Sequence, residues 1–137
     1  MKQCIRFFLL LLICFHSQLA VSNEPPATPK IVYFTLKPEI VINYINTGTK
    51  LGFLTVTIKL MMKNSADLAI VEYHQPLILD TIITVLSRES EESVKSLAGR
   101  ELIRQSCLNA VNKVLTSEVD TEDNIVADLL FTKYLYQ

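Results

Sequence analysis

The sequence contains few of the residues from which active sites and metal centres are built. Its 137 residues include three cysteines, two histidines and three glycines, and it has no tryptophan. The glycines are too scattered to form a loop that cradles phosphate. If the first 22 residues are removed as an export signal, Cys107 and His74 are the last of their types. One thiol cannot form an internal disulfide, and this pair cannot supply the four ligands of a structural zinc site.

The charge is too small and too evenly spread for a nucleic acid-binding protein. The full chain has 13 basic and 14 acidic residues. Loss of Lys2 and Arg6 with the signal leaves 11 basic against 14 acidic residues, a net charge of −3, with no basic block. Binding driven by neutralisation of phosphates is therefore not expected.

Residues 1–22 have the pattern of a secretory signal. Lys2 and Arg6 precede the apolar run 7–15, which is shorter than the roughly 20 helical residues needed to cross a hydrocarbon core. Ala20 and Ser22 are small residues at the −3 and −1 positions of a cleavage site before Asn23. The alternative is an uncleaved signal anchor. In both cases we expect the bulk of the chain to lie outside the cytoplasm.

The remainder is expected to form a Pro-rich linker, residues 23–30, followed by one domain, residues 31–137. Runs of β-branched and aromatic residues predict strands at 31–36 and 39–45. Residues 53–62 alternate, which predicts a strand with one covered face. The side chains expected on that face are Leu54, Val56, Ile58, Leu60 and Met62. Residues 125–137 predict a last strand, with Leu129, Phe131 and Leu135 on one face and Tyr134 and Tyr136 on the other.

Helical patterns lie between these strands. A short helix is predicted at 66–73 and a second from Pro76, a residue suited to the first helical turn. The second helix has an apolar stripe that consists of Leu79, Ile82, Ile83 and Leu86. Ser90 can cap a third helix, in which Gly99 indicates a close contact or a kink. This third helix is expected to bury Ile103, Cys107, Ala110, Val111 and Val114.

The order of these elements predicts an α+β fold. Strands come first, helices follow and a strand ends the chain, without the regular alternation of a parallel α/β protein. We therefore expect a mostly antiparallel sheet with helices packed on one face.

Four short segments add a family resemblance. They read YFTLKPEIVIN at 33–43, PLILDTIITVLS at 76–87, GRELIR at 99–104 and DLLFTKYLYQ at 128–137. No single segment is specific, but together and in this order they resemble the FliL family of flagellar basal body-associated proteins. The resemblance covers residues 33–137.

The resemblance implies a stomatin-like domain on the periplasmic side of the bacterial inner membrane, at the flagellar basal body. FliL proteins assemble into rings around the ion-driven stator units and support motility and chemotaxis. It therefore implies a homo-oligomer that contacts stator and basal-body proteins, with no cofactor and no enzymatic activity. The alternative is a soluble periplasmic binding module that is detached from the motor.

Five residues are candidates for interface contacts. Asp80 lies off the apolar stripe of its helix and recurs in the family pattern, so it is a candidate for a polar contact between copies, with Arg100 or Arg104 as partner. The alternative is a solvated or internally paired side chain, worth at most about 1 kcal/mol. Tyr134 and Tyr136 are candidates for an oligomer contact, because aromatic residues are enriched at interfaces, or they cover the outer side of the sheet.

His74 and Cys107 are the remaining candidates for chemistry. His74 lies close to Glu72, and a histidine beside a carboxylate can act as a general acid or base in an exported hydrolase. No nucleophile stands at a recognisable spacing, so we interpret His74 as a helix-junction residue. Cys107 lies on an apolar helix face, where a free cysteine behaves as a small hydrophobic residue.

Overall fold

The computed structural model of the protein describes residues 30–45 and 51–137. The expected signal at 1–22 and almost all of the linker at 23–30 lie outside the described residues. The described strands are β1 (Val32–Thr35), β2 (Ile40–Ile45), β3 (Leu51–Met62) and β4 (Asp128–Tyr136). The described helices are α2 (Asp67–Tyr73), α3 (Gln75–Leu86), α4 (Glu91–Lys95) and α5 (Leu97–Glu118).

The long strand β3 organises the sheet. It pairs antiparallel with β1 and β2, which follow each other along one edge, and with β4 along the other edge. The order and direction of these strands confirm the predicted antiparallel sheet. β4 has no strand beyond it among the described residues, so its outer edge is free.

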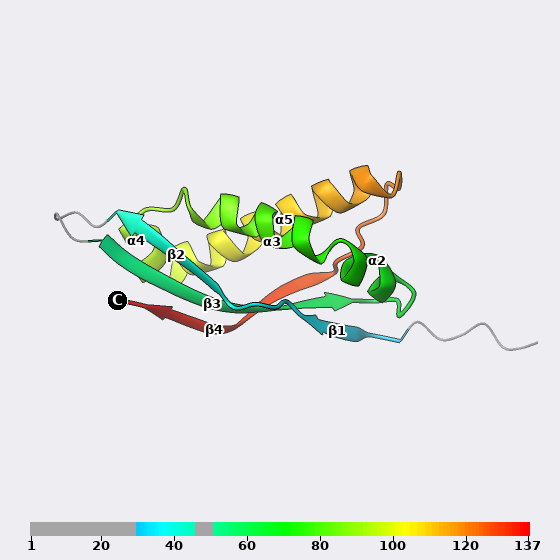
Figure 1. Cartoon of the computed structure of the whole chain (residues 1–137), viewed down its shortest axis with the longest axis horizontal. Helices are drawn as coiled ribbons and strands as arrows, with labels where there is room; N and C mark the ends of the chain where they lie inside the picture. The colour runs from blue at the N-terminus through cyan, green and yellow to red at the C-terminus, as the bar shows by residue number, and fades with distance from the viewer. Residues whose placement is uncertain (1–29, 46–50) are drawn as a thin grey trace, which may run out of the picture.

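Helices α3, α4 and α5 lie over one face of the sheet, and α2 lies at one end of the molecule (Figure 1). The alternating side chains of β3 that were expected on the covered face are all buried beneath these helices. The α+β fold class, with helices on one face, is therefore confirmed. The opposite face of the sheet carries exposed apolar residues, and Val41, Phe53 and Leu135 are among them.

Helix α3 turns a different side to the core from the one predicted. Ile78, Ile82 and Leu86 are fully buried, whereas Ile83 is 41% exposed and Leu79 is only half-buried. The helix has apolar residues on more than one side, so periodicity alone does not select the side that meets the sheet and α5.

The predicted third helix is two helices. Ser90 caps α4 as expected, with its hydroxyl accepting a bond from the Ser93 N–H. Ser96 then ends α4 and caps α5 by accepting from the Gly99 N–H at 3.0 Å. The predicted close contact at Gly99 is confirmed, because a Cβ there would lie 2.2 Å from the Ser93 carbonyl oxygen.

The buried side of α5 was predicted in part. Ile103, Cys107 and Val111 are fully buried as expected. Ala110 and Val114 are only half-buried, and their place in the core is taken by Asn112 and Leu115. The predicted set mixed two neighbouring faces of one helix, and only the face toward the sheet is covered.

Asn112 shows how a polar residue is accommodated in this core. Its amide donates to the Val126 carbonyl at 2.8 Å, and its side-chain oxygen accepts from the Val126 N–H at 2.9 Å. Both polar groups of the side chain therefore have partners. The pair ties the segment before β4 to α5.

A β-bulge changes the predicted faces of the last strand. Ile58 pairs with Phe131 but Thr57 pairs with Lys133, so Thr132 is an extra residue in β4. An extra residue exchanges the two faces of the strand beyond it. The prediction that Tyr134 and Tyr136 lie opposite Phe131, with Leu135 beside it, is therefore wrong. The rings of Phe131 and Tyr134 lie 5.2 Å apart on the helix-covered side, and Leu135 is exposed.

Candidate functional site

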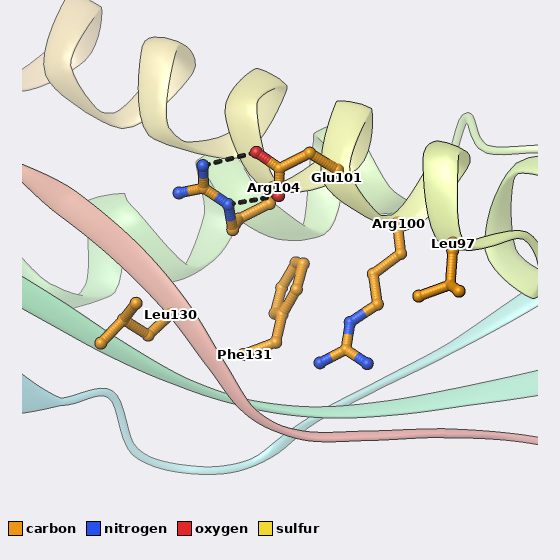
Figure 2. A pocket seen from close by; sticks show the side chains of 6 residues that line it. All are labelled: Leu97, Arg100, Glu101, Arg104, Leu130 and Phe131. Carbon is orange, nitrogen blue, oxygen red and sulfur yellow. Dashed lines mark hydrogen bonds and ion pairs between the residues drawn. The ribbon is translucent and has the colours of Figure 1, made fainter.

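The main candidate site is a groove between α5 and the free edge of β4 (Figure 2). It has a volume of about 370 Å³ and is called the α5–β4 groove below. Its lining combines apolar and charged side chains: Leu97, Arg100, Glu101, Arg104, Leu130 and Phe131. A smaller hollow of about 130 Å³ continues it past Leu97 and Arg100 toward Tyr134 and Tyr136.

Arg104 connects the two walls of the groove. Its guanidinium donates to Glu101 at 2.8 and 2.6 Å, as Figure 2 shows, and on the other side to the Asp128 carboxylate and the Leu129 carbonyl. The hydrogen bonds from Arg104 and then from Gln105 lower the pKa of Glu101 to about 2. The hydrogen bond to Glu101 raises the pKa of Arg104. Because the guanidinium is engaged within its own chain, Arg104 holds α5 against β4.

Arg100 is in a different situation. Its guanidinium carbon lies 4.8 Å from the centroid of the Tyr134 ring, a cation–π contact. The ion pairs among residues 30–45 and 51–137 use Lys95, Arg104 and Lys133, and none of them includes Arg100. Arg100 therefore offers a positive charge without a carboxylate partner in the described part of the chain.

Tyr134 is fixed between the sheet and the helices. Its hydroxyl donates to the Val94 carbonyl of α4 at 3.1 Å. Burial raises its pKa to about 12. Tyr136 lies further along the same strand and is 47% exposed. Of the two predicted interface tyrosines, Tyr136 offers the more accessible surface.

Asp80 lies in a second groove, between α3 and α5. This groove has a volume of about 480 Å³ and carries Val85 and Val114 among its apolar lining, with Asp80, Arg88 and Lys113 as its charged residues. None of the hydrogen bonds and ion pairs between described residues involves the Asp80 carboxylate, whose side chain is exposed. The structure therefore brings Arg100, Arg104, Tyr134 and Tyr136 to one region and places Asp80 in another.

His74 stands at the junction of α2 and α3, as predicted. It ends the first helix and begins the second, and its backbone N–H donates to the Ile70 carbonyl at 3.0 Å. Its ring makes a T-shaped contact with the Tyr73 ring, with the two centroids 4.9 Å apart. Across residues 30–45 and 51–137, no three His, Cys, Asp or Glu side chains are grouped so that they could hold a metal ion.

In the same part of the chain, no single helix has the length and apolar composition needed to cross a membrane. Together α2 and α3 have them, although the two helices are bent by 70° relative to each other.

Three surface residues were missed by the sequence analysis. Tyr73 is 82% exposed, Leu97 is 86% exposed and Leu102 is 65% exposed. Tyr73 lies in α2, Leu97 and Leu102 lie in α5, and the sequence analysis singled out none of them. The family segment around Gly99 includes Leu102, but no pattern in the sequence indicated that this side chain faces solvent.

The comparisons with known proteins agree with one another. The family described as "Flagellar basal body-associated protein FliL" matches residues 33–137. The chain is also 23% identical over 112 residues to the "Flagellar protein FliL" of Aquifex aeolicus (strain VF5). That match covers 81% of this chain and 65% of the relative, so the chain spans a little under two thirds of the length of the curated relative. Apart from Val32 at the start of β1, the family match includes every described strand and helix, and the chain therefore belongs to the FliL family of flagellar basal body-associated proteins, a non-enzymatic family.

Proposed function

We propose that this protein assists the stator units of the flagellar motor in motility and chemotaxis, through self-association and contacts with other motor proteins. The observation that carries the proposal is the family match over residues 33–137, which spans all of the described helices and nearly all of the sheet. The exposed apolar and charged residues around the α5–β4 groove support a role based on contacts.

The proposed location is the periplasmic side of the inner membrane, at the basal body. Residues 1–22 act there either as a signal that is cleaved before Asn23 or as a retained anchor. Mass spectrometry of the protein isolated from cell fractions distinguishes these forms. An N-terminus at Asn23 in the soluble periplasm would favour the detached binding module, whereas an intact N-terminus in the membrane fraction would favour the anchored form.

Deletion of the gene tests the proposed function directly. We expect the deletion strain to swim and swarm more poorly, most clearly in viscous medium where the motor works under load. Expression of the full chain from a plasmid should restore motility, and a fluorescent fusion should localise at flagellar bases. Normal motility under load, with no localisation at motors, would refute the proposal.

A further inference from the structure

One end of the molecule carries an exposed aromatic side chain with a free acidic neighbour. Tyr73 ends α2 and is 82% exposed, more than any other aromatic side chain in the described part of the chain. The Glu72 side chain beside it is exposed, and none of the ion pairs between described residues includes it. These two residues are called the Tyr73 knob below.

The two helices that meet at the knob are acidic. Residues 67–86, which form α2 and α3, contain Asp67, Glu72 and Asp80 but no lysine or arginine. An interface between proteins gains specificity when a surface of one sign meets a surface of the other. The partner surface for the knob is therefore expected to combine an apolar hollow with a cation.

The α5–β4 groove has both properties. Leu97 at its mouth is 86% exposed, Phe131 lines it, and Arg100 lies between them without a carboxylate partner in the described part of the chain. Tyrosine and arginine, together with tryptophan, are enriched among the residues that contribute most of the binding energy at protein interfaces. A volume of about 370 Å³ accommodates one aromatic side chain.

The knob and the groove lie far apart in one copy. Figure 1 shows α2 at one end of the molecule and α4, which leads directly into Leu97, at the other. A knob therefore cannot occupy the groove of its own chain, but it can occupy that of a second copy.

We propose that copies of this chain associate head to tail, with Tyr73 of one copy inserted into the α5–β4 groove of the next and Glu72 facing Arg100. The occupant of the groove is a second copy, because the knob supplies an apolar ring for the hollow and a carboxylate for Arg100, whereas the groove's own carboxylate, Glu101, is bound to Arg104. A contact between two different surfaces leaves one of each unoccupied at the ends, so it builds closed rings or open chains and not only dimers. This inference rests on the self-association in the proposed function and names the surfaces that produce it.

Cysteine cross-linking in cells tests this contact with the full-length protein. Cys4 and Cys14 are first replaced by serine, and Cys107 is retained because it is fully buried. Tyr73→Cys and Leu97→Cys are then combined in one chain, which replaces the native copy. Oxidation is expected to produce a ladder of dimers, trimers and larger species, because every copy carries both halves of the contact.

The controls separate a head-to-tail contact from other associations. Each single-cysteine variant should remain monomeric on oxidation, and the two single variants expressed together should produce dimers only. Tyr73→Cys combined with Leu102→Cys is a matched pair, because Leu102 is an exposed leucine on the same helix that does not line the groove. No ladder is expected from that pair.

Charge reversal tests the Glu72–Arg100 contact independently of the groove's apolar part. In the double-cysteine chain, Glu72→Arg or Arg100→Glu alone should reduce the cross-linked fraction about tenfold, since like charges then face each other. The two reversals together should restore it. A ladder that is unaffected by either reversal, a ladder of equal intensity from the Leu102 pair, or cross-links only to a different protein would overturn the proposal.

The head-to-tail contact and the motor function are tested by separate experiments. If the deletion strain has a motility defect but the Tyr73 and Leu97 cysteines give no ladder, the head-to-tail contact is wrong and the proposed function stands. If the ladder forms but the deletion strain moves normally, the contact is correct and the motor function is wrong.

Discussion

Replacing Gly99 with alanine provides a sharp test of the structure, because local and tertiary effects predict opposite signs. Alanine is favoured over glycine within a helix by up to about 1 kcal/mol. A reader of the sequence alone would therefore expect Gly99→Ala to stabilise the protein. In the structure, the added Cβ would lie 2.2 Å from the carbonyl oxygen, 2.6 Å from the Cα and 2.7 Å from the carbonyl carbon of Ser93.

The atoms that would clash belong to the backbone of α4, which cannot rotate away as a side chain can. Overpacking of this kind costs about 1–3 kcal/mol, and a backbone contact belongs in the upper half of that range. After subtraction of the helical preference for alanine, the net destabilisation is about 1–2 kcal/mol. For a domain of about 100 residues, each kcal/mol lowers Tm by roughly 4–8 °C.

Urea denaturation followed by circular dichroism measures this effect. Ser106 is the matched control, because it is exposed within the same helix. Ser106→Ala should be more stable than Ser106→Gly by about 1 kcal/mol, which calibrates the helical preference. If Gly99→Ala gained a similar amount of stability over the native protein, the close approach of α4 to α5 would be refuted.

Two further predictions concern the core. Ile82→Ala should destabilise the protein by about 2–5 kcal/mol, because Ile82 is fully buried. Ile83→Ala should cost less than about 1 kcal/mol, because Ile83 is 41% exposed. Equal costs would contradict the orientation of α3. Burial raises the pKa of the Cys107 thiol from 9.0 to about 12. As the pH rises above 9, the thiol therefore ionises in the unfolded chain before it ionises in the folded protein. The contribution of the buried thiol to stability is intact below pH 9 and is lost as the pH rises toward 12. Urea midpoints between pH 8 and 11 should therefore fall more steeply for the native protein than for Cys107→Ala, and parallel slopes would contradict this reasoning.

Elements with a clear local signal were predicted well. The alternation from Leu54 to Met62 identified both the central strand and its buried face, because side chains in a strand alternate strictly. Ser90 identified the start of a helix, because its hydroxyl satisfies an N–H at the first turn. The order of strands and helices was then sufficient for the fold class.

The errors arose where a distant segment decides the outcome. The apolar pattern of α3 allows two neighbouring faces, and contact with α5 and the sheet buries Ile82 while it leaves Ile83 exposed. Thr132 looked like an ordinary strand residue, but the register of β4 against β3 makes it a bulge and turns Tyr134 toward Arg100.

The candidate site follows the same division. Arg100, Arg104, Tyr134 and Tyr136 were named from the sequence. The sequence did not indicate that Arg104 is bound to Glu101 and Asp128, while Arg100 has no such partner among the residues that the structure describes.

By itself, the sequence determined what is encoded within a few neighbouring residues: the period of each element, its caps and the family pattern. The tertiary structure alone decided which face of each helix is covered, which cation is left without a carboxylate and which side chains remain exposed. The physical reason is that burial and ion pairing depend on contacts between segments that are far apart along the chain, and these contacts exist only after the sheet has taken its register and the helices have packed against it.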